Sequence, residues 1–324
     1  MSALPEAVLT KEKAMADRFN SLLRGVANFF RFIFWLIAAG VLIVVLARWL
    51  LLPSIEDKRL AALQALQKER NSKALTLIHR KETITFLGIP VKSYIDINDA
   101  EAVLRVIRES APQKPIDLIM HTPGGLVLAA SQIAHALRQH EGKVTVFIPH
   151  YAMSGGTLIA LAADDIVMAP NAVLGPVDPQ IGIFPAASII QAVKRKPVAD
   201  VEDHTLILED ISTKAIDQIN GLVFSLLKDK HPEKKAKEIA DVLTTGHFTH
   251  DYPINIDRAK QMGLSVSTDM PKSVYNLMQL YTPEGSGRHG DPNRRRLRRR
   301  AHRLRLRAAR RRRQRPRRRP LPRG

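Results

Sequence analysis

Two glycine-rich motifs, each preceded by a short apolar run, are the part of this chain best suited to chemistry. The motif HTPGG occupies residues 121–125, and the motif MSGGT occupies residues 153–157. Glycine turns at the ends of neighbouring strands can expose a serine hydroxyl and direct backbone N–H groups toward one point. That combination suits acyl transfer, and it predicts a peptidase.

Ser154 is the candidate nucleophile, and the glycines beside it are the candidate oxyanion hole. A serine hydroxyl attacks poorly until a base removes its proton. The N–H of Gly155 lies at a predicted helix start, where backbone donors are unsatisfied, and Gly124 or Gly125 can supply a second donor. The alternative is that Ser154 only caps a helix and the glycines only form turns. Two such turns at successive strand ends favour the catalytic interpretation.

A third segment, LGPVDPQ at residues 174–180, completes a pattern that resembles the serine dehydrogenase proteinase family. Its members are membrane-associated relatives of signal peptide peptidase A and of the Clp protease catalytic subunit. The resemblance covers roughly residues 55–270. It implies a Clp/crotonase-like spiral of βαβ units, serine peptidase chemistry without ATP or another cofactor, and self-association into a ring. It also implies substrates that are peptides or apolar segments of membrane proteins.

The base that would activate the serine is harder to find. The Clp branch places a histidine about one strand and turn after its serine, but residues 171–176 of this chain contain none. His121 and His150 lie near the motifs without occupying that position. This departure argues against a Ser-His-Asp triad.

The signal peptide peptidase branch instead implies a Ser-Lys dyad, with the lysine on a downstream helix. Lys214 is preferred over Lys194 and Lys196, which lie in a proline-flanked stretch, because it borders the apolar face of a long amphipathic helix. Lys214 also precedes the Ser-Leu pair at 225–226 by eleven residues, close to the spacing in membrane-bound relatives. Burial would favour the neutral amine that can accept a proton. The alternative is an exposed lysine at a helix start.

The elements that must position these residues alternate between strand and helix. Strands followed by helices imply βαβ units and a largely parallel sheet, so the fold class is α/β. The expected strands are 75–78, 83–87, 116–120, 144–148 and 166–168. The expected helices are one capped by Asn98 or Asp99, then 126–138, 155–163, one through 211–226, and one capped by Gly263. Residues 184–204 are expected to form a mobile loop.

An uncharged apolar segment at residues 32–47 predicts a transmembrane helix. With its flanks it fills residues 29–52, and roughly 20 apolar residues cross the hydrocarbon core. Trp35 and Trp49 suit the two membrane interfaces. Basic residues are equally frequent on both sides, so orientation is not predicted. We expect a single-pass protein of the cell (inner) membrane, with a polar lead at 1–28.

Charge is concentrated at the end of the chain. The net charge is +19, but residues 285–324 hold nineteen arginines and one acid, so +18 belongs there and +1 to the rest. We therefore expect a juxtamembrane segment at 53–73, a peptidase domain at 74–283 and a disordered tail at 284–324. The tail suits anionic lipid or nucleic acid, although it has no Phe, Tyr or Trp for base stacking.

Two other functional classes fit parts of the pattern. The same fold serves acyl-CoA enzymes, which need neither a serine nucleophile nor a lysine base. A non-catalytic membrane scaffold could use only the anion-binding tail. A metal site is not expected, because the His247 and His250 pair has no further ligand cluster nearby.

Overall fold

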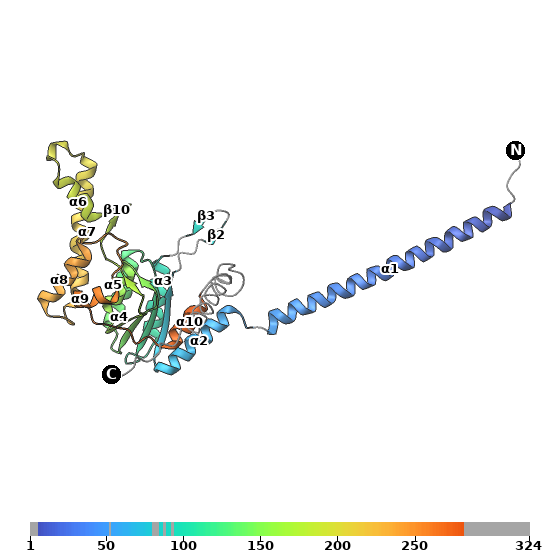
Figure 1. The fold of residues 1–324 in the computed structure, drawn as a ribbon, viewed down its shortest axis with the longest axis horizontal. Coiled ribbons are helices and arrows are strands. Elements are labelled where there is room, and N and C mark those ends of the chain that lie inside the picture. Colours follow the sequence, from blue (N-terminus) through green and yellow to red (C-terminus); the bar gives the residue numbers. More distant parts are fainter. Residues whose placement is uncertain (1–5, 52, 80–83, 87–88, 92–93, 282–324) are drawn as a thin grey trace, which may run out of the picture. The chain divides into compact units, whose positions relative to one another are not determined.

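The chain forms a long N-terminal helix and an α/β domain (Figure 1). The computed structural model describes residues 6–51, 53–79, 84–86, 89–91 and 94–281. It contains two compact units, Met1–Ala61 and Ala62–Gly324. The predicted arginine-rich tail at 284–324 lies outside the described residues.

Helix α1 (Glu6–Leu51) runs without interruption through the predicted polar lead and the predicted span. Its segment Ser21–Val44 has a mean hydropathy of 2.0 and is not buried against protein, so it is long and apolar enough to cross a membrane. The helix ends just before Pro53, as expected because proline disfavours helical backbone in the residue before it. A reciprocal pair of hydrogen bonds between Ser54 and Asp57 then starts α2 (Ile55–Arg70).

A five-stranded parallel sheet is the centre of the domain. Its order is β1-β4-β5-β7-β11, and the pairing puts Leu75 opposite Leu118 and Ile119 opposite Phe147. The strands are β1 (Lys73–Ile78), β4 (Ile116–His121), β5 (Val144–Ile148), β7 (Asp165–Met168) and β11 (Val266–Ser267). These confirm the predicted parallel α/β architecture.

Both faces of the sheet are covered, so its strands are apolar on both sides. One core joins Leu118, Met120 and Val146 to helices α3 (Ile97–Glu109), α4 (Val127–Gln139) and α5 (Gly155–Ala162). The other core joins Ile119 and Phe147 to Leu66 of α2 and to α10 (Lys272–Gln279). Alternate residues of one strand therefore enter different cores.

Parallel strands end at a common edge of the sheet, which we call the carboxyl edge, and begin at the opposite amino edge. The HTPGG motif begins at the last residue of β4, and the MSGGT motif is separated from the end of β5 by four residues. Short strands extend the carboxyl edge: β6 (Tyr151–Ala152) pairs with β8 (Val173–Leu174), and Thr122 bridges to Ala152. The sheet thus brings the two motifs to the same edge, as the sequence predicts.

Residues 184–204 are not the loop that we expected. They contain α6 (Ala186–Lys194) and a short 3-10 helix (Val198–Asp200), and α7 (Asp203–Leu227) begins before they end. The prediction was wrong because Pro185 and Pro197 were interpreted as loop residues, whereas each precedes a helix, where proline is well tolerated. Figure 1 shows α6 beside α7.

Other boundaries shift by a few residues. Asp96 caps α3, and Asp99 is the third helical residue that bonds back to it, so the prediction of Asn98 or Asp99 as the cap was wrong. The expected strand at 83–87 is β2 (Ile84–Phe86), which pairs with β3 (Ile89–Val91). Gly263, at φ 101°, caps α9 (Ile256–Met262) as predicted. The remaining elements are β9 (Gln180–Ile181), β10 (Phe184–Pro185) and α8 (Glu233–Thr244).

Candidate active site

Ser154 occupies a strained turn between β6 and α5. Its φ of 51° and ψ of −118° lie in a region that L-residues other than glycine rarely adopt. Such a conformation costs on the order of 1–3 kcal/mol and persists where the surrounding structure enforces it. The half-buried side chain makes no capping hydrogen bond to α5. The interpretation of Ser154 as an ordinary helix cap therefore loses its main support.

The two glycine motifs meet at this serine. A Cβ placed on Gly124 would lie 2.8 Å from Cβ of Ser154 and 2.9 Å from the Met153 carbonyl oxygen. A Cβ placed on Gly155 would lie 3.5 Å from the Gly125 nitrogen. The distances at Gly124 leave no room for a side chain, whereas the distance at Gly155 is an ordinary van der Waals contact. The fold therefore brings together Ser154 and all three glycines named from the sequence.

The three glycine N–H groups differ in their availability. The N–H of Gly124 donates to the Thr122 hydroxyl at 3.2 Å. Within the described residues, the N–H groups of Gly125 and Gly155 donate to no protein acceptor. Gly155 is also the first residue of α5, where the helix dipole favours negative charge. Gly125 and Gly155 are thus the donors that remain open to an oxyanion.

Both histidines considered from the sequence lie at the carboxyl edge. His121 is buried at the end of β4, with its ring centroid 5.3 Å from that of His150 and 4.2 Å from that of Tyr151. His150 is exposed after β5. With Tyr151 they form an aromatic group at the start of the HTPGG motif and just before the MSGGT motif.

The three candidate lysines are all exposed. Lys214 leaves 66% of its side chain in solvent and pairs with Asp210, one turn earlier on α7, at 2.5 Å. It lies about three turns after the first residue of α7 and not at the helix start. Lys194 ends α6, and Lys196 follows it. The structure does not bring any of the three into a buried site with Ser154.

A buried carboxylate paired with a histidine was not foreseen. Asp178 leaves 3% of its side chain exposed and contacts Nδ1 of His250 at 2.8 Å, while His250 remains 37% exposed. The amide of Gln180 donates to the same carboxylate at 2.7 Å. Both residues belong to motifs recognised in the sequence, LGPVDPQ and the segment around His247, but 72 residues separate them. Only tertiary structure could pair them.

The segment that carries Asp178 packs against the serine turn. The Thr157 hydroxyl donates at 2.8 Å to the Gly175 carbonyl and accepts from the Gly175 N–H at 3.0 Å. A Cβ placed on Gly175 would lie 3.3 Å from Cα of Met153, which directly precedes Ser154. These contacts connect the Asp178–His250 pair to the MSGGT turn.

Lys230 has a perturbed pKa, but it lies at the other end of α5. Burial, opposed by the charge of Asp164, lowers the pKa of Lys230 to about 8. Its ammonium donates to the carbonyl oxygens of Leu161 and Ala163, at the C-terminus of α5. Ser154 is at the N-terminus of the same helix, so Lys230 is a helix cap and not the base.

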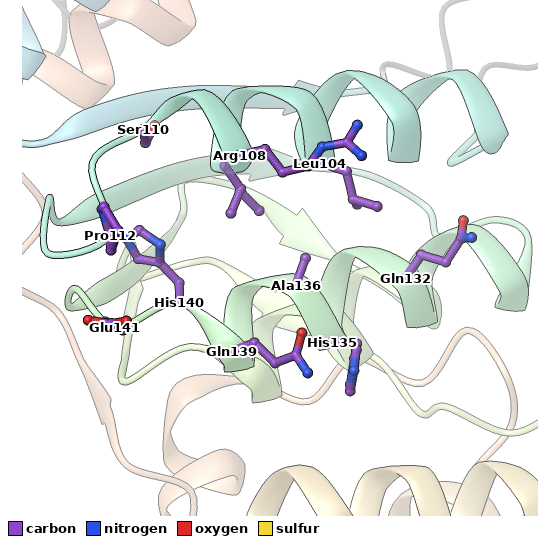
Figure 2. A pocket seen from close by; sticks show the side chains of 11 residues that line it. Leu104, Arg108, Ser110, Pro112, Gln132, His135, Ala136, Gln139, His140 and Glu141 are labelled. Carbon is purple, nitrogen blue, oxygen red and sulfur yellow. The ribbon is translucent and has the colours of Figure 1, made fainter.

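A cavity of about 460 Å³ between α3 and α4 is also separate from the serine turn (Figure 2). Figure 2 shows Leu104 and Arg108 of α3 facing Gln132 and Ala136 of α4, with Pro112 and His140 at one end. Neither the glycines nor Ser154 line it. We therefore assign the chemistry to the serine turn and not to this cavity.

Comparison with known proteins identifies a family for this chain. A family model described as ClpP-like SDH-type serine proteinase matches residues 20–290. Two uncharacterized proteins of Methanocaldococcus jannaschii are similar to this chain: one is 57% identical, covering 69% of this chain and 78% of that protein, and the other is 55% identical, covering 69% and 76%. The solved structure of a membrane-bound stomatin-specific protease is 19% identical and has a TM-score of 0.39, covering 57% of this chain and 79% of that one.

Proposed function

This chain belongs to the ClpP-like SDH-type serine proteinases, and on that premise we propose that it is a membrane-anchored, ATP-independent endopeptidase with Ser154 as nucleophile. The observation that carries the proposal is the strained Ser154 turn, which meets two open N–H donors. An acyl-CoA enzyme of the same fold does not require a serine at position 154. A non-catalytic scaffold does not require a strained turn at that position.

The proposed reaction uses the residues of the carboxyl edge. Oγ of Ser154 attacks the scissile carbonyl carbon while a base takes the hydroxyl proton. The N–H groups of Gly125 and Gly155 hold the resulting oxyanion. The intermediate then breaks its C–N bond, the leaving amine takes the proton back from the base, and water hydrolyses the acyl-enzyme by the same route.

Lys214 is the base proposed from the sequence. To serve, it must be neutral, separate from Asp210 and reach Ser154 from an exposed position on α7. We also propose self-association, on the basis of the family resemblance. In such an assembly, an exposed residue of one subunit can complete the active site of another. The Ser-Lys dyad therefore requires a rearrangement or a neighbouring copy.

His250 is the second candidate, and the Asp178 contact favours it. A buried carboxylate that binds Nδ1 fixes the orientation of the imidazole and stabilises the imidazolium formed during proton transfer. His250 itself is 37% exposed. The chain order serine, aspartate, histidine suits a triad that differs from the Clp arrangement considered from the sequence.

Kinetics of single variants in the full-length protein distinguish the two bases. If Lys214 is the base, Lys214→Arg should abolish peptide hydrolysis, because a guanidinium stays protonated. If His250 is the base, His250→Ala should abolish hydrolysis, Asp178→Asn should lower kcat strongly, and Lys214→Arg should remain active. His247→Ala is the matched control, since His247 is an exposed histidine three residues before His250.

Labelling with a fluorophosphonate tests the nucleophile itself. The modified residue should be Ser154, and Ser154→Ala should remain unlabelled and inactive. Modification of another serine would contradict the proposal. Retained hydrolysis by Ser154→Ala would mean that another group is the nucleophile. A wild-type protein that hydrolyses no peptide would instead favour an acyl-CoA-type enzyme or a scaffold.

The membrane and partner proposals rest on α1 and on charge. We propose that Ser21–Val44 anchors the protein in the inner membrane, so that membrane-associated or apolar peptide segments are the substrates within reach. The arginines after residue 284 are proposed to bind anionic lipid or nucleic acid. Truncation after Glu284 should leave hydrolysis of a soluble peptide unchanged and weaken salt-dependent binding to anionic vesicles or to DNA. Unchanged binding would remove the tail from the proposal.

A further inference from the structure

A second histidine–carboxylate pair lies behind the HTPGG turn. His79 directly follows β1, and 8% of its side chain is exposed. Its Nε2 lies 3.1 Å from Oδ2 of Asp99, and its Nδ1 lies 3.1 Å from the hydroxyl oxygen of Thr122. The imidazole thus connects α3 to the turn that follows β4. No step of the proposed reaction uses it.

The contacts of this pair branch at Thr122, whose hydroxyl lies 3.1 Å from Nδ1 of His79 and 3.4 Å from the Gly124 carbonyl oxygen. The contact with His79 is the shorter of the two. The tautomer with its hydrogen on Nε2 donates to the Asp99 carboxylate and accepts the Thr122 hydroxyl hydrogen at Nδ1. The Thr122 oxygen then accepts the N–H of Gly124 at 3.2 Å. Asp99 is itself held by the Asp96 N–H, at 2.9 Å, in the capping box of α3.

A second contact fixes the other end of Gly124. The N–H of Ile95 donates to the Gly124 carbonyl at 2.9 Å, and the Ile95 carbonyl accepts the N–H of Leu126 at 2.9 Å. The C=O and N–H of a trans peptide point in opposite directions. Because the Gly124 carbonyl points toward Ile95, the Gly125 N–H of the same peptide points away from it. The hydrogen bond between the Ile95 N–H and the Gly124 carbonyl therefore sets the direction of the Gly125 N–H.

Thr122 also joins this turn to the serine turn. Its N–H donates to the Tyr151 carbonyl at 3.1 Å, and its carbonyl accepts the Met153 N–H at 3.0 Å. A Cβ placed on Gly156 would lie 2.6 Å from the Thr122 methyl. A displacement of Thr122 would therefore alter the separation between the Gly125 donor and Ser154.

We propose that His79 and Thr122 are positioning residues of the peptidase, which hold the Gly124–Gly125 peptide so that its N–H stays aimed at the oxyanion. The proposal rests on the proposed function, because it assigns the aimed N–H to that reaction. Neither residue touches substrate. Their contribution is expected mainly in kcat, since the oxyanion forms after the substrate is bound.

Variants of His79 and Thr122 test this directly in the full-length protein. His79→Leu and Thr122→Val remove the polar atoms but keep similar bulk, and each should lower kcat by about 10- to 100-fold with KM changed little, less than the full loss of a donor costs. His79→Asn places an amide near the Nδ1 position, and Thr122→Ser keeps the hydroxyl. Both should recover most of kcat.

Ser72→Ala is the matched control, because the Ser72 hydroxyl is also buried and donates at 2.5 Å to a carboxylate, that of Asp117, at the amino edge. It should lower the thermal unfolding temperature without lowering kcat. Two outcomes overturn the proposal: wild-type kcat in His79→Leu, or a kcat loss that His79→Asn does not recover. If Ser154→Ala is inactive and His79→Leu is not, only the positioning proposal fails. If Ser154→Ala stays active, the proposed function fails instead.

Discussion

The amino edge and the carboxyl edge of the parallel sheet carry similar polar groups, but these groups have different surroundings. At the amino edge, Asp117 is buried and is bonded by Arg70, at 2.6 and 3.1 Å, and by Ser72. At the carboxyl edge of the same strand, β4, Thr122 binds His79, which binds Asp99. Each is a network of three residues, partly or fully buried, around a buried side chain: Asp117 in the first and His79 in the second. Only the second lies beside open backbone donors and a strained serine.

Among the described residues, two that are not glycine have a positive φ: Asn71 (50°), just before β1 at the amino edge, and Ser154 (51°) at the carboxyl edge. Asparagine adopts this backbone region more readily than serine does, so the strain is greater at Ser154. At the carboxyl edge, Ser154 adopts a positive φ and the N–H groups of Gly125 and Gly155 lack a protein acceptor within the described chain. At the amino edge, the carboxylate of Asp164 accepts the Val144 N–H, and Lys230 binds the last carbonyls of α5. Satisfied polar groups stabilise a fold, whereas open donors and strain are features of reactive sites. We therefore expect mutations at the two edges to affect different measurements.

The largest effect is expected at Ser154. Ser154→Ala should lower kcat for peptide hydrolysis by more than about a thousandfold, because an activated serine cannot be replaced by the remaining site. Its free energy of unfolding should change little, since the side chain makes no capping bond. Hydrolysis of a peptide by the detergent-solubilised protein, together with urea unfolding, measures both.

Ser154→Gly sharpens the same test. Glycine accepts a φ of 51° without strain, so this variant should be inactive and about 1 kcal/mol more stable than Ser154→Ala. Equal stability of the two variants would mean that the turn stores no strain. In that case the contrast between the edges would rest on the open donors alone.

The site could be predicted from the sequence only where its residues are close in the chain. The HTPGG and MSGGT motifs, the strands before them and the parallel sheet follow from local pattern, since glycine and apolar runs act within a few residues. His79–Asp99 and Asp178–His250 join segments 20 and 72 residues apart, and no local pattern encodes such a pair. The helical pattern favours Lys214, but it does not reveal whether the side chain points into the domain or into solvent.

The second prediction concerns the amino edge. Asp117→Asn should lower the free energy of unfolding by about 2–3 kcal/mol, because it leaves the partly buried Arg70 guanidinium without its charge partner. Arg70 also stacks on Phe147, 4.8 Å from the ring centroid, so it cannot simply turn into solvent. The kcat of the folded protein should remain that of the wild type.

Urea unfolding followed by circular dichroism is the measurement for Asp117→Asn. Tryptophan fluorescence is unsuitable, because Trp35 and Trp49 both lie in α1 and not in the α/β domain. A fall in kcat at full folded population would break the comparison, since it would show that the amino edge also controls the reaction.

The smallest effect is expected at Lys230, and it depends on pH. The ordinary lysine pKa of 10.5 falls to about 8 in the folded protein because burial disfavours the ammonium. Above pH 10.5 the amine is neutral in the folded and the unfolded state, so its burial carries no penalty for desolvating a charge. As pH falls from 10.5 to 8, the unfolded chain binds a proton that the folded chain does not, so stability falls; below 8 the penalty is constant. Wild-type stability should therefore rise between pH 8 and pH 10.5 through this group. The slope should be smaller than about 1.4 kcal/mol per pH unit, which is the value for one proton, because solvent reaches part of the side chain.

Lys230→Met should lose this slope and keep its kcat at pH 7, since Lys230 binds the end of α5 that is remote from Ser154. Urea unfolding of both proteins from pH 7.5 to 9.5 measures the difference. Parallel curves would mean that the ammonium is not buried in solution, and a lost kcat would place Lys230 in the reaction after all.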